Sequence, residues 1–156
     1  MACLCDETYM RAALAEADLA AAQGEVPVGA VIVCAGEVIA RAHNLCITHQ
    51  SATQHAELLA IEEASRVLGR WRLSDCTLYV TLEPCPMCAG AIINSRIGRV
   101  VYAARDPRAG ALGSLLNLTA YPLEASPVCE SGLLADEALE RLRVFFQDLR
   151  TATKQP

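Results

Sequence analysis

The side chains best suited to chemistry lie in two short motifs. His55 and Glu57 are separated by one alanine, and Cys85 and Cys88 belong to a Pro-Cys-Pro-Met-Cys segment. One imidazole and two thiolates fill three positions around a tetrahedral zinc ion and leave the fourth open to water, as in catalytic zinc sites. Glu57 is then a free carboxylate beside that water and can act as its base. The spacing therefore predicts one zinc ion held by His55, Cys85 and Cys88, with Glu57 as the catalytic residue of a hydrolysis.

Other interpretations of these residues stay open. A redox dithiol would use the same Cys-x-x-Cys spacing, but it would not need a His-x-Glu motif elsewhere in the chain. A closed structural zinc site would need a fourth protein ligand, for which Cys76, His43 and His49 are candidates. Glu57 alone would be an ordinary acid in the first turn of a helix, where the helix dipole favours negative charge.

Hydrophobic periodicity places both motifs at the starts of helices. The expected helices cover residues 7–22, 55–68, 86–94 and 135–150, and the expected strands cover residues 26–34, 37–43, 76–82, 99–104 and 128–130. A hairpin followed by strands that alternate with helices predicts an α/β domain with three αβα layers and a mixed sheet of about five strands. We expect a single domain over residues 1–156, with its core within residues 6–150. Ligands bind beyond the carboxyl ends of the strands in such sheets, where the third strand delivers Cys85.

Two of the expected helices show an apolar stripe that should face the core. In the helix over residues 55–68 the stripe is Leu58, Ile61, Ala64, Val67 and Leu68. In the last helix it is Leu139, Leu142, Phe145, Phe146 and Leu149.

Charge is unevenly distributed along the chain. The net charge is −5, which by itself argues against a nucleic-acid partner, because phosphates attract clustered Lys and Arg. Residues 96–113, however, contain Arg96, Arg99, Arg105 and Arg108 against Asp106 alone. This stretch is the expected basic surface for a polyanion.

Composition also indicates where the protein works. Apolar stretches stay well short of the roughly 18 residues that a membrane helix needs, so we expect no membrane span. The first seven residues include Asp6 and Glu7 and lack the pattern of a secretion signal, which favours the cytoplasm. The eight cysteines should then be reduced thiols, and the six outside the zinc motif should be mostly small buried hydrophobes.

The chain resembles the bacterial-type tRNA-specific adenosine deaminases of the cytidine deaminase-like superfamily, whose zinc signature is His-x-Glu followed by Pro-Cys-x-x-Cys. The resemblance runs from about residue 9 to residue 150 without obvious gaps. It is carried by Asn44 and by residues 25–31, 55–57, 81–90, 94–102, 104–106 and 110–115. A cytidine deaminase-like fold is the architecture that it implies.

The resemblance also implies a substrate and its contacts. Asn44 would hydrogen-bond the target base, Val28 and Leu82 would line its pocket, and Asp106 would hold the flanking nucleotide. The partners would be a tRNA anticodon stem-loop and a second copy of the chain in a homodimer, and the product would be inosine at the wobble position. Asn44 could instead be a simple turn residue after a strand, and Asp106 part of a plain turn.

Three segments depart from the family pattern near expected substrate contacts. Residues 51–54 are Ser-Ala-Thr-Gln in place of the usual Asp-Pro-Thr-Ala, residues 124–127 replace an Asn-His-Arg-like run, and Gln147 replaces a basic residue. Two alternative functions therefore stay open. One is deamination of a free nucleobase or nucleoside of the guanine, adenosine or cytidine type. The other is a noncatalytic, zinc-stabilised partner subunit, which would not need Glu57.

Overall fold

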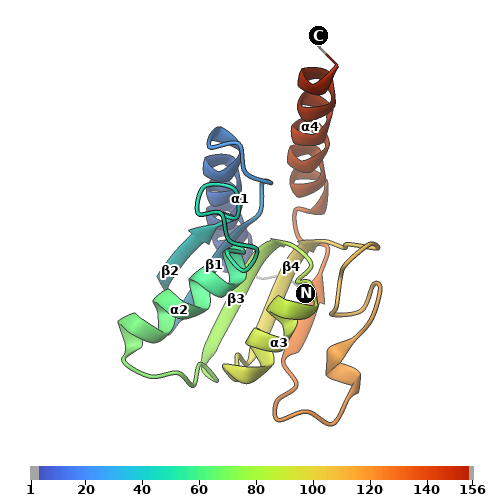
Figure 1. Cartoon of the computed structure of the whole chain (residues 1–156). Helices are drawn as coiled ribbons and strands as arrows, with labels where there is room; N and C mark the ends of the chain where they lie inside the picture. The colour runs from blue at the N-terminus through green and yellow to red at the C-terminus, as the bar shows by residue number, and fades with distance from the viewer. Residues whose placement is uncertain (1–3, 155–156) are drawn as a thin grey trace.

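The computed structural model describes residues 4–154, which fold into alternating helices and strands (Figure 1). The elements are α1 (Leu4–Ala22), β1 (Gly29–Cys34), β2 (Glu37–His43), α2 (Ala56–Leu68), β3 (Cys76–Leu82), α3 (Pro86–Asn94), β4 (Arg99–Ala104), η1 (Leu118–Ala120), β5 (Val128–Ser131) and α4 (Ala135–Thr153). The expected bounds of β2, β3, α3 and β4 are confirmed, and those of the other expected elements differ by one to three residues at an end. The short helix η1 was not expected.

The strands form one mixed sheet of five, in the order β2-β1-β3-β4-β5. β1 pairs antiparallel with β2 and with β3, whereas β3, β4 and β5 are parallel neighbours. The β1–β2 turn is made by Ala35 and Gly36, which both have positive φ values, 52° and 79°. That combination matches the right-handed twist of the strands in a two-residue hairpin.

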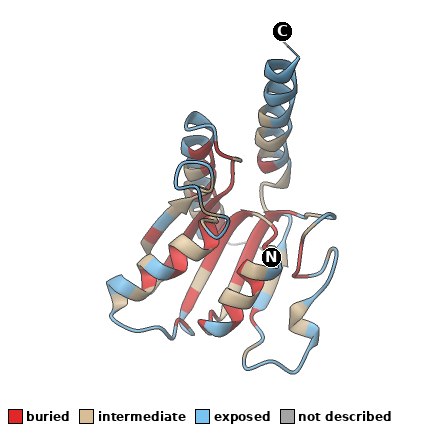
Figure 2. Ribbon diagram, viewed as in Figure 1, coloured by how far each residue is buried: buried red, intermediate tan, exposed pale blue. Residues whose placement is uncertain are grey.

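Helices cover both faces of the sheet, and each face has its own core (Figures 1 and 2). On one face, α2 and α3 bury Ile61 and Ile92 against strand residues such as Leu78 and Val100. On the other, α1 and α4 pack against the side chains that alternate with these along the strands, including Tyr79. The expected three-layer αβα architecture is confirmed. Within residues 4–154 no helix has the length and apolar character needed to cross a bilayer.

The prediction that the apolar face of α4 points inward is wrong for most of the helix. Leu139, Phe146 and Leu149 are exposed, and Ala138 is the only buried residue of the helix. Figure 2 shows α4 leaving the body of the protein, so that only its first turns lie against the sheet. On α2, Val67 is likewise exposed, because it lies in the last turn of the helix.

The arginine-rich stretch is less available to a polyanion than its sequence indicates. Arg99 donates to the carboxylate of Asp6 at 2.8 Å and to that of Glu130 at 2.8 Å. These ion pairs tie β4 to the start of α1 and to β5, so Arg99 is a structural residue. Arg96 pairs with Glu124 at 3.1 Å. The expectation of a basic surface formed by all four arginines is therefore wrong.

Cysteines outside the zinc motif differ in burial. Cys76 is buried, Cys34, Cys46 and Cys129 are partly buried, and Cys5 is exposed on α1. The expectation, which concerned most of these cysteines and not all, is met fully by Cys76 and is not met by Cys5. Cys3 lies outside the described residues.

Candidate active site

Both motifs lie at helix starts, as expected. His55 is the residue that precedes α2 and has extended backbone angles, φ −80° and ψ 150°, while Glu57 lies in the first turn. Cys85 has the same position before α3, where Pro86 is a favourable first residue because a helix start needs no N–H there. Cys88 follows one turn later, on the buried side of α3. The two helix starts meet above the carboxyl end of β3.

The imidazole and both thiols converge with a spacing that suits zinc. The Nδ1 atom of His55 lies 3.6 Å from Sγ of Cys85 and 3.5 Å from Sγ of Cys88. Tetrahedral zinc with Zn–S bonds near 2.3 Å and a Zn–N bond near 2.05 Å would separate nitrogen from sulfur by about 3.6 Å. The three donors therefore fit the ion without rearrangement.

The candidate fourth ligands lie elsewhere. Cys76 is at the opposite end of β3 from Leu82. His43 is bound through Nδ1 to the carboxylate of Glu16 at 2.7 Å, and His49 faces the side-chain oxygen of Gln54 at 3.0 Å. Within residues 4–154 the donor cluster contains only His55, Cys85 and Cys88, which leaves one zinc position open and argues against a closed structural site.

Electrostatics of the cluster favour a cation. Hydrogen bonding from Cys88, together with His55, lowers the pKa of Cys85 to about 4 against the opposing effect of burial. The hydrogen bond to Cys85, followed by burial, raises the pKa of Cys88. The hydrogen bond with Cys85 also raises the pKa of His55. A metal that binds here therefore has to replace the proton that Cys88 holds more tightly than usual.

Glu57 is an unusually buried acid beside these donors. Its exposed fraction is 4%, and burial raises the pKa of its carboxyl group. A raised pKa suits a group that must both accept and return protons near neutral pH.

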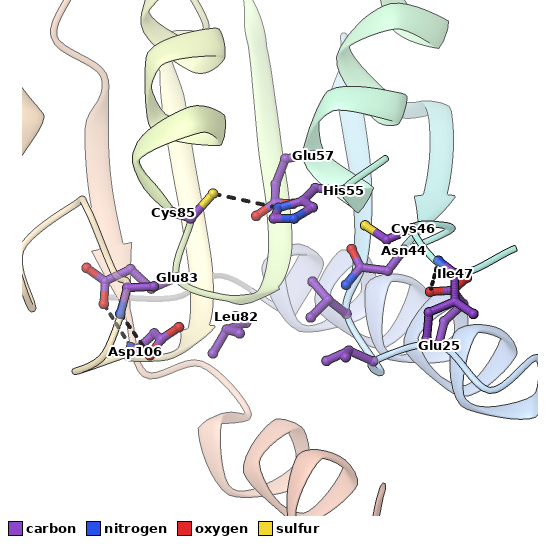
Figure 3. A pocket seen from close by; sticks show the side chains of 13 residues that line it. Glu25, Asn44, Cys46, Ile47, His55, Glu57, Leu82, Glu83, Cys85 and Asp106 are labelled. Atoms are coloured by element: carbon purple, nitrogen blue, oxygen red, sulfur yellow. Dashed lines mark hydrogen bonds between the residues drawn. The ribbon is translucent and has the colours of Figure 1, made fainter. Parts of the chain in front are cut away.

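A cavity of about 280 Å³ opens in front of the cluster and brings the expected site residues together (Figure 3). His55, Glu57, Cys85, Val28, Asn44, Leu82 and Asp106 all line it. Sequence reasoning missed Glu25, Val26, Cys46, Ile47, Glu83 and Ala109. In Figure 3, Asn44 and Glu25 lie on one side of the ligands, and Glu83 and Asp106 on the other.

Asn44 has a defined role in holding the site together. Its Oδ1 accepts a hydrogen bond from the backbone N–H of Ala56 at 2.9 Å, while the side chain of His55 makes no such cap. Asn44 therefore caps α2 from outside the helix and fixes the position of His55. The side-chain NH₂ group is left as the part of Asn44 that can donate to a ligand in the cavity.

Two buried glutamates that the motif analysis overlooked organise the loops beside the cavity. Glu83 accepts backbone hydrogen bonds from Asp106, Leu112 and Ser114 at 3.0, 3.2 and 3.0 Å. Gly110 allows this close approach, because a Cβ there would collide with the Glu83 carboxylate.

Glu25 plays the same part on the other side of the cavity. It accepts from the backbone N–H groups of Ile47 and Thr48 at 3.2 and 2.6 Å. Although burial opposes ionisation, these hydrogen bonds leave the pKa of Glu25 below its usual value. For Glu83 the only sequence signal was an acid directly before the Pro-Cys-Pro-Met-Cys segment, and Glu25 had no comparable signal.

Comparison with known proteins also identifies the two motifs as a zinc-binding region. Residues 4–104 match the family model described as the cytidine and deoxycytidylate deaminase zinc-binding region. The chain is 51% identical over 152 residues to the tRNA-specific adenosine deaminase of Bacillus subtilis (strain 168), covering 96% of this chain and 93% of that protein. It belongs to the tRNA-specific adenosine deaminase family.

Solved structures place this deaminase among related enzymes. A structure from a study of A-to-I editing by tRNA:A34 deaminases superposes with a TM-score of 0.84 at 44% identity, covering 86% of this chain and 99% of that chain. A guanine deaminase from Bacillus subtilis superposes with a TM-score of 0.62 at 45% identity, covering 64% of each chain. The first match spans more of both chains.

The three departures from the family pattern are each accommodated by local hydrogen bonds in this deaminase. The loop that lacks a proline is closed by backbone bonds from Ser51 to Cys46 and from Leu45 to Gln54, both at 3.0 Å. Glu124 pairs with Arg96, as described above. The side chain of Gln147 accepts a hydrogen bond from Arg143 at 2.8 Å.

Replacing a ligand should remove the metal. We expect the wild-type deaminase to retain zinc at this site after dialysis and Cys88→Ser to lose it, because a serine hydroxyl is not ionised at neutral pH. Stability should fall by several kcal/mol, since binding free energy at such a site is also folding free energy. Elemental analysis and thermal unfolding measure both effects. Cys129→Ser is the matched control, and full zinc occupancy in Cys88→Ser would contradict the assignment.

Replacing Glu83 should loosen the loop that it holds. Glu83→Gln keeps the size of the side chain but presents an NH₂ group to at least one of the three backbone donors. We expect a loss of about 1–3 kcal/mol in stability, the cost of an unsatisfied buried group. KM should rise more than kcat falls, with zinc content unchanged. The exposed Glu37→Gln is the control, and an unchanged KM and melting temperature would exclude this positioning role.

Proposed function

We propose that this chain deaminates adenosine 34 of a tRNA anticodon loop to inosine, with one zinc ion held by His55, Cys85 and Cys88. The observation that carries the proposal is a cavity lined by His55, Cys85, the buried Glu57 and the amide of Asn44, with Cys88 in the same donor cluster. Hydrolysis adds water at C6 of the purine and releases ammonia. The names of its full-length relatives support tRNA as the substrate.

Glu57 moves the protons in this mechanism. When bound, zinc supplies a Lewis acid that brings the pKa of a coordinated water close to 7. Glu57 accepts one proton of the attacking water and passes it to N1 of the purine. It then takes the second proton from the oxygen added at C6 and delivers it to the departing amine, so that ammonia leaves as the C6 carbonyl forms. Its burial favours this work, because a carboxyl group with a raised pKa both accepts and donates protons readily. His55, Cys85 and Cys88 remain ligands throughout.

The walls of the cavity select and orient the base. Val28 and Leu82 offer apolar contact to the faces of the purine ring. Asn44 donates from its NH₂ group to a ring nitrogen, because its Oδ1 is already engaged by Ala56. Asp106 shapes the rim through Oδ1, which accepts from the N–H of Arg108 at 2.9 Å, and its other oxygen contacts the flanking nucleotide.

A basic groove beside the cavity accommodates the RNA backbone. It measures about 410 Å³ and is lined by Arg108, Leu139, Leu142, Arg143, Phe146 and Arg150. Arg143 is paired with Glu140, so Arg108 and Arg150 supply the positive charge of the groove. Arg108 lies in the same loop as the cavity residues Asp106 and Ala109, so the groove adjoins the rim. Local positive charge of this kind allows an acidic protein to bind a polyanion. A base in an RNA loop is already partly unstacked, which lowers the cost of extruding it into the cavity.

A homodimer is part of the proposal. Large apolar side chains are exposed in the segment that follows the cavity loop, namely Leu115, Leu116, Tyr121 and Leu123. Clustered apolar surface of this type supports a protein interface.

A second candidate substrate is a free nucleobase. The guanine deaminase from Bacillus subtilis is 45% identical over part of the chain, which favours this alternative. The noncatalytic partner subunit is disfavoured, because Glu57 is present and buried beside the ligands.

Glu57→Gln tests the proton transfers. The amide keeps the shape of the side chain but cannot accept a proton, so we expect kcat to fall by at least about 10² to 10⁴. Zinc content should be unchanged. Glu62→Gln, on the exposed side of the same helix, is the control. A Glu57→Gln enzyme with more than about a tenth of wild-type activity would mean that another base does this work.

The substrate is tested by measuring ammonia and inosine with an anticodon stem-loop and with free adenosine, guanine and cytidine. We expect activity on the stem-loop that weakens steeply with salt, because phosphate contacts release counterions. Arg108→Glu should raise KM for the stem-loop by about tenfold, equivalent to about 1.4 kcal/mol. Arg66→Glu, in the last turn of α2, is the control. Fast, salt-independent turnover of a free base without inosine in RNA would falsify the tRNA proposal and leave the zinc chemistry intact.

A further inference from the structure

A second pair of thiols lies at the far end of the sheet from the cavity. Cys34 ends β1 and Cys76 begins β3, and the two are direct partners in the antiparallel register. β3 has seven residues, so Cys76 lies about 20 Å from Leu82 at the cavity end. In Figure 1 this is the edge where the chain passes from α2 into β3. The pair is thus separate from the proposed catalytic centre.

Asp75 completes a group of three donors with these thiols. Sγ of Cys34 donates to one carboxylate oxygen at 3.8 Å, and Sγ of Cys76 donates to the other at 3.7 Å. All donor atoms of the group lie within 4.8 Å of one another. Across residues 4–154, only this trio and the catalytic trio meet that spacing.

Charge around the trio is balanced for a divalent cation. Arg70 donates to both oxygens of Asp75, at 2.7 and 2.8 Å. With both thiols ionised, the trio carries three negative charges, which one divalent cation and the guanidinium of Arg70 neutralise. Without a cation, burial and the hydrogen bond with Cys34 raise the pKa of Cys76 to about 12. The proton on Cys76 is therefore what a cation has to displace.

We propose that Cys34, Asp75 and Cys76 form a second binding site, for a thiophilic divalent cation of the zinc type. Two thiolates favour zinc over magnesium or calcium, which prefer sites made only of oxygen ligands. Binding releases two protons, one from each thiol, as two metal–sulfur bonds form. Asp75 is exposed at the surface, so the ion can enter from solvent.

The site is structural, because it joins β1, β3 and the loop before β3 and has no contact with the cavity. Binding there adds to the stability of the fold. It is weaker than binding at the catalytic centre, because Asp75, whose two oxygens already accept from Arg70, takes the place of an imidazole ligand. The inference does not depend on which substrate the enzyme deaminates.

Zinc stoichiometry tests the proposal. The full-length protein is held under a phosphine reductant and dialysed against micromolar zinc, and bound zinc is measured by elemental analysis. We expect two ions per wild-type chain, one in Cys34→Ser, one in Cys88→Ser and none in the double variant. The melting temperature of wild type and of Cys88→Ser should rise with zinc, whereas that of the double variant should not. Deaminase activity of Cys34→Ser should match wild type.

Two further variants keep the test decisive. Asp75→Asn removes a ligand charge at an exposed position without touching a thiol, so it should weaken the second zinc at least tenfold even if Cys34→Ser folds poorly. Cys129→Ser, a partly buried cysteine that donates only to the carbonyl of Pro127, should retain both ions. The proposal is overturned if wild type binds one zinc, if Asp75→Asn binds the second as tightly as wild type, or if Cys129→Ser loses it. Zinc loss in Cys88→Ser alone, with two ions retained in Cys34→Ser, would overturn it as well.

Discussion

The contact between one imidazole and two thiols is the constraint on which the rest of the site depends. It requires the starts of α2 and α3 to meet with N–S separations of 3.5 and 3.6 Å. Both helices pack on the same face of the sheet through one hydrophobic core, which fixes their relative position. Asn44 then sets the start of α2, and the parallel β3 and β4 carry the chain into Cys85 and Asp106. Catalytic geometry is thus a consequence of core packing.

The loops around the cavity are held by a different device. They have little regular structure, so their backbone N–H groups need other acceptors. Glu25 and Glu83 supply these acceptors from positions that are 1% and 2% exposed. Each carboxylate accepts hydrogen bonds from two or three backbone N–H groups. It thereby takes the place of the carbonyl oxygens that would accept these bonds in a helix or sheet. The site is therefore bordered by two loops whose shape depends on buried charge.

Sequence patterns predicted the parts of the molecule that depend on local order. The bounds of β3, α3 and β4 follow from apolar runs, and the zinc ligands follow from motif spacing. The orientation of α4 could not be predicted. An apolar stripe on a helix does not reveal whether it packs on the core of the same chain or on the surface of another molecule. The ion pair of Arg99 with Asp6 joins residues far apart in the sequence, so charge counting along the chain placed Arg99 wrongly. Glu83 was missed because its partners are backbone groups, which no side-chain pattern reveals.

The residues proposed for the chemistry and those proposed to contact RNA beyond the target base lie in different parts of this chain. The general deaminase region ends at residue 104, which is also the end of β4. The proposed zinc ligands and base, His55, Glu57, Cys85 and Cys88, lie within that region. The rim at Asp106 and the groove formed by Arg108 and α4 lie beyond it. Because Arg108 lies outside the region that holds the proposed zinc ligands, its charge can be reversed without altering a ligand, so this substitution tests RNA recognition separately from the metal centre.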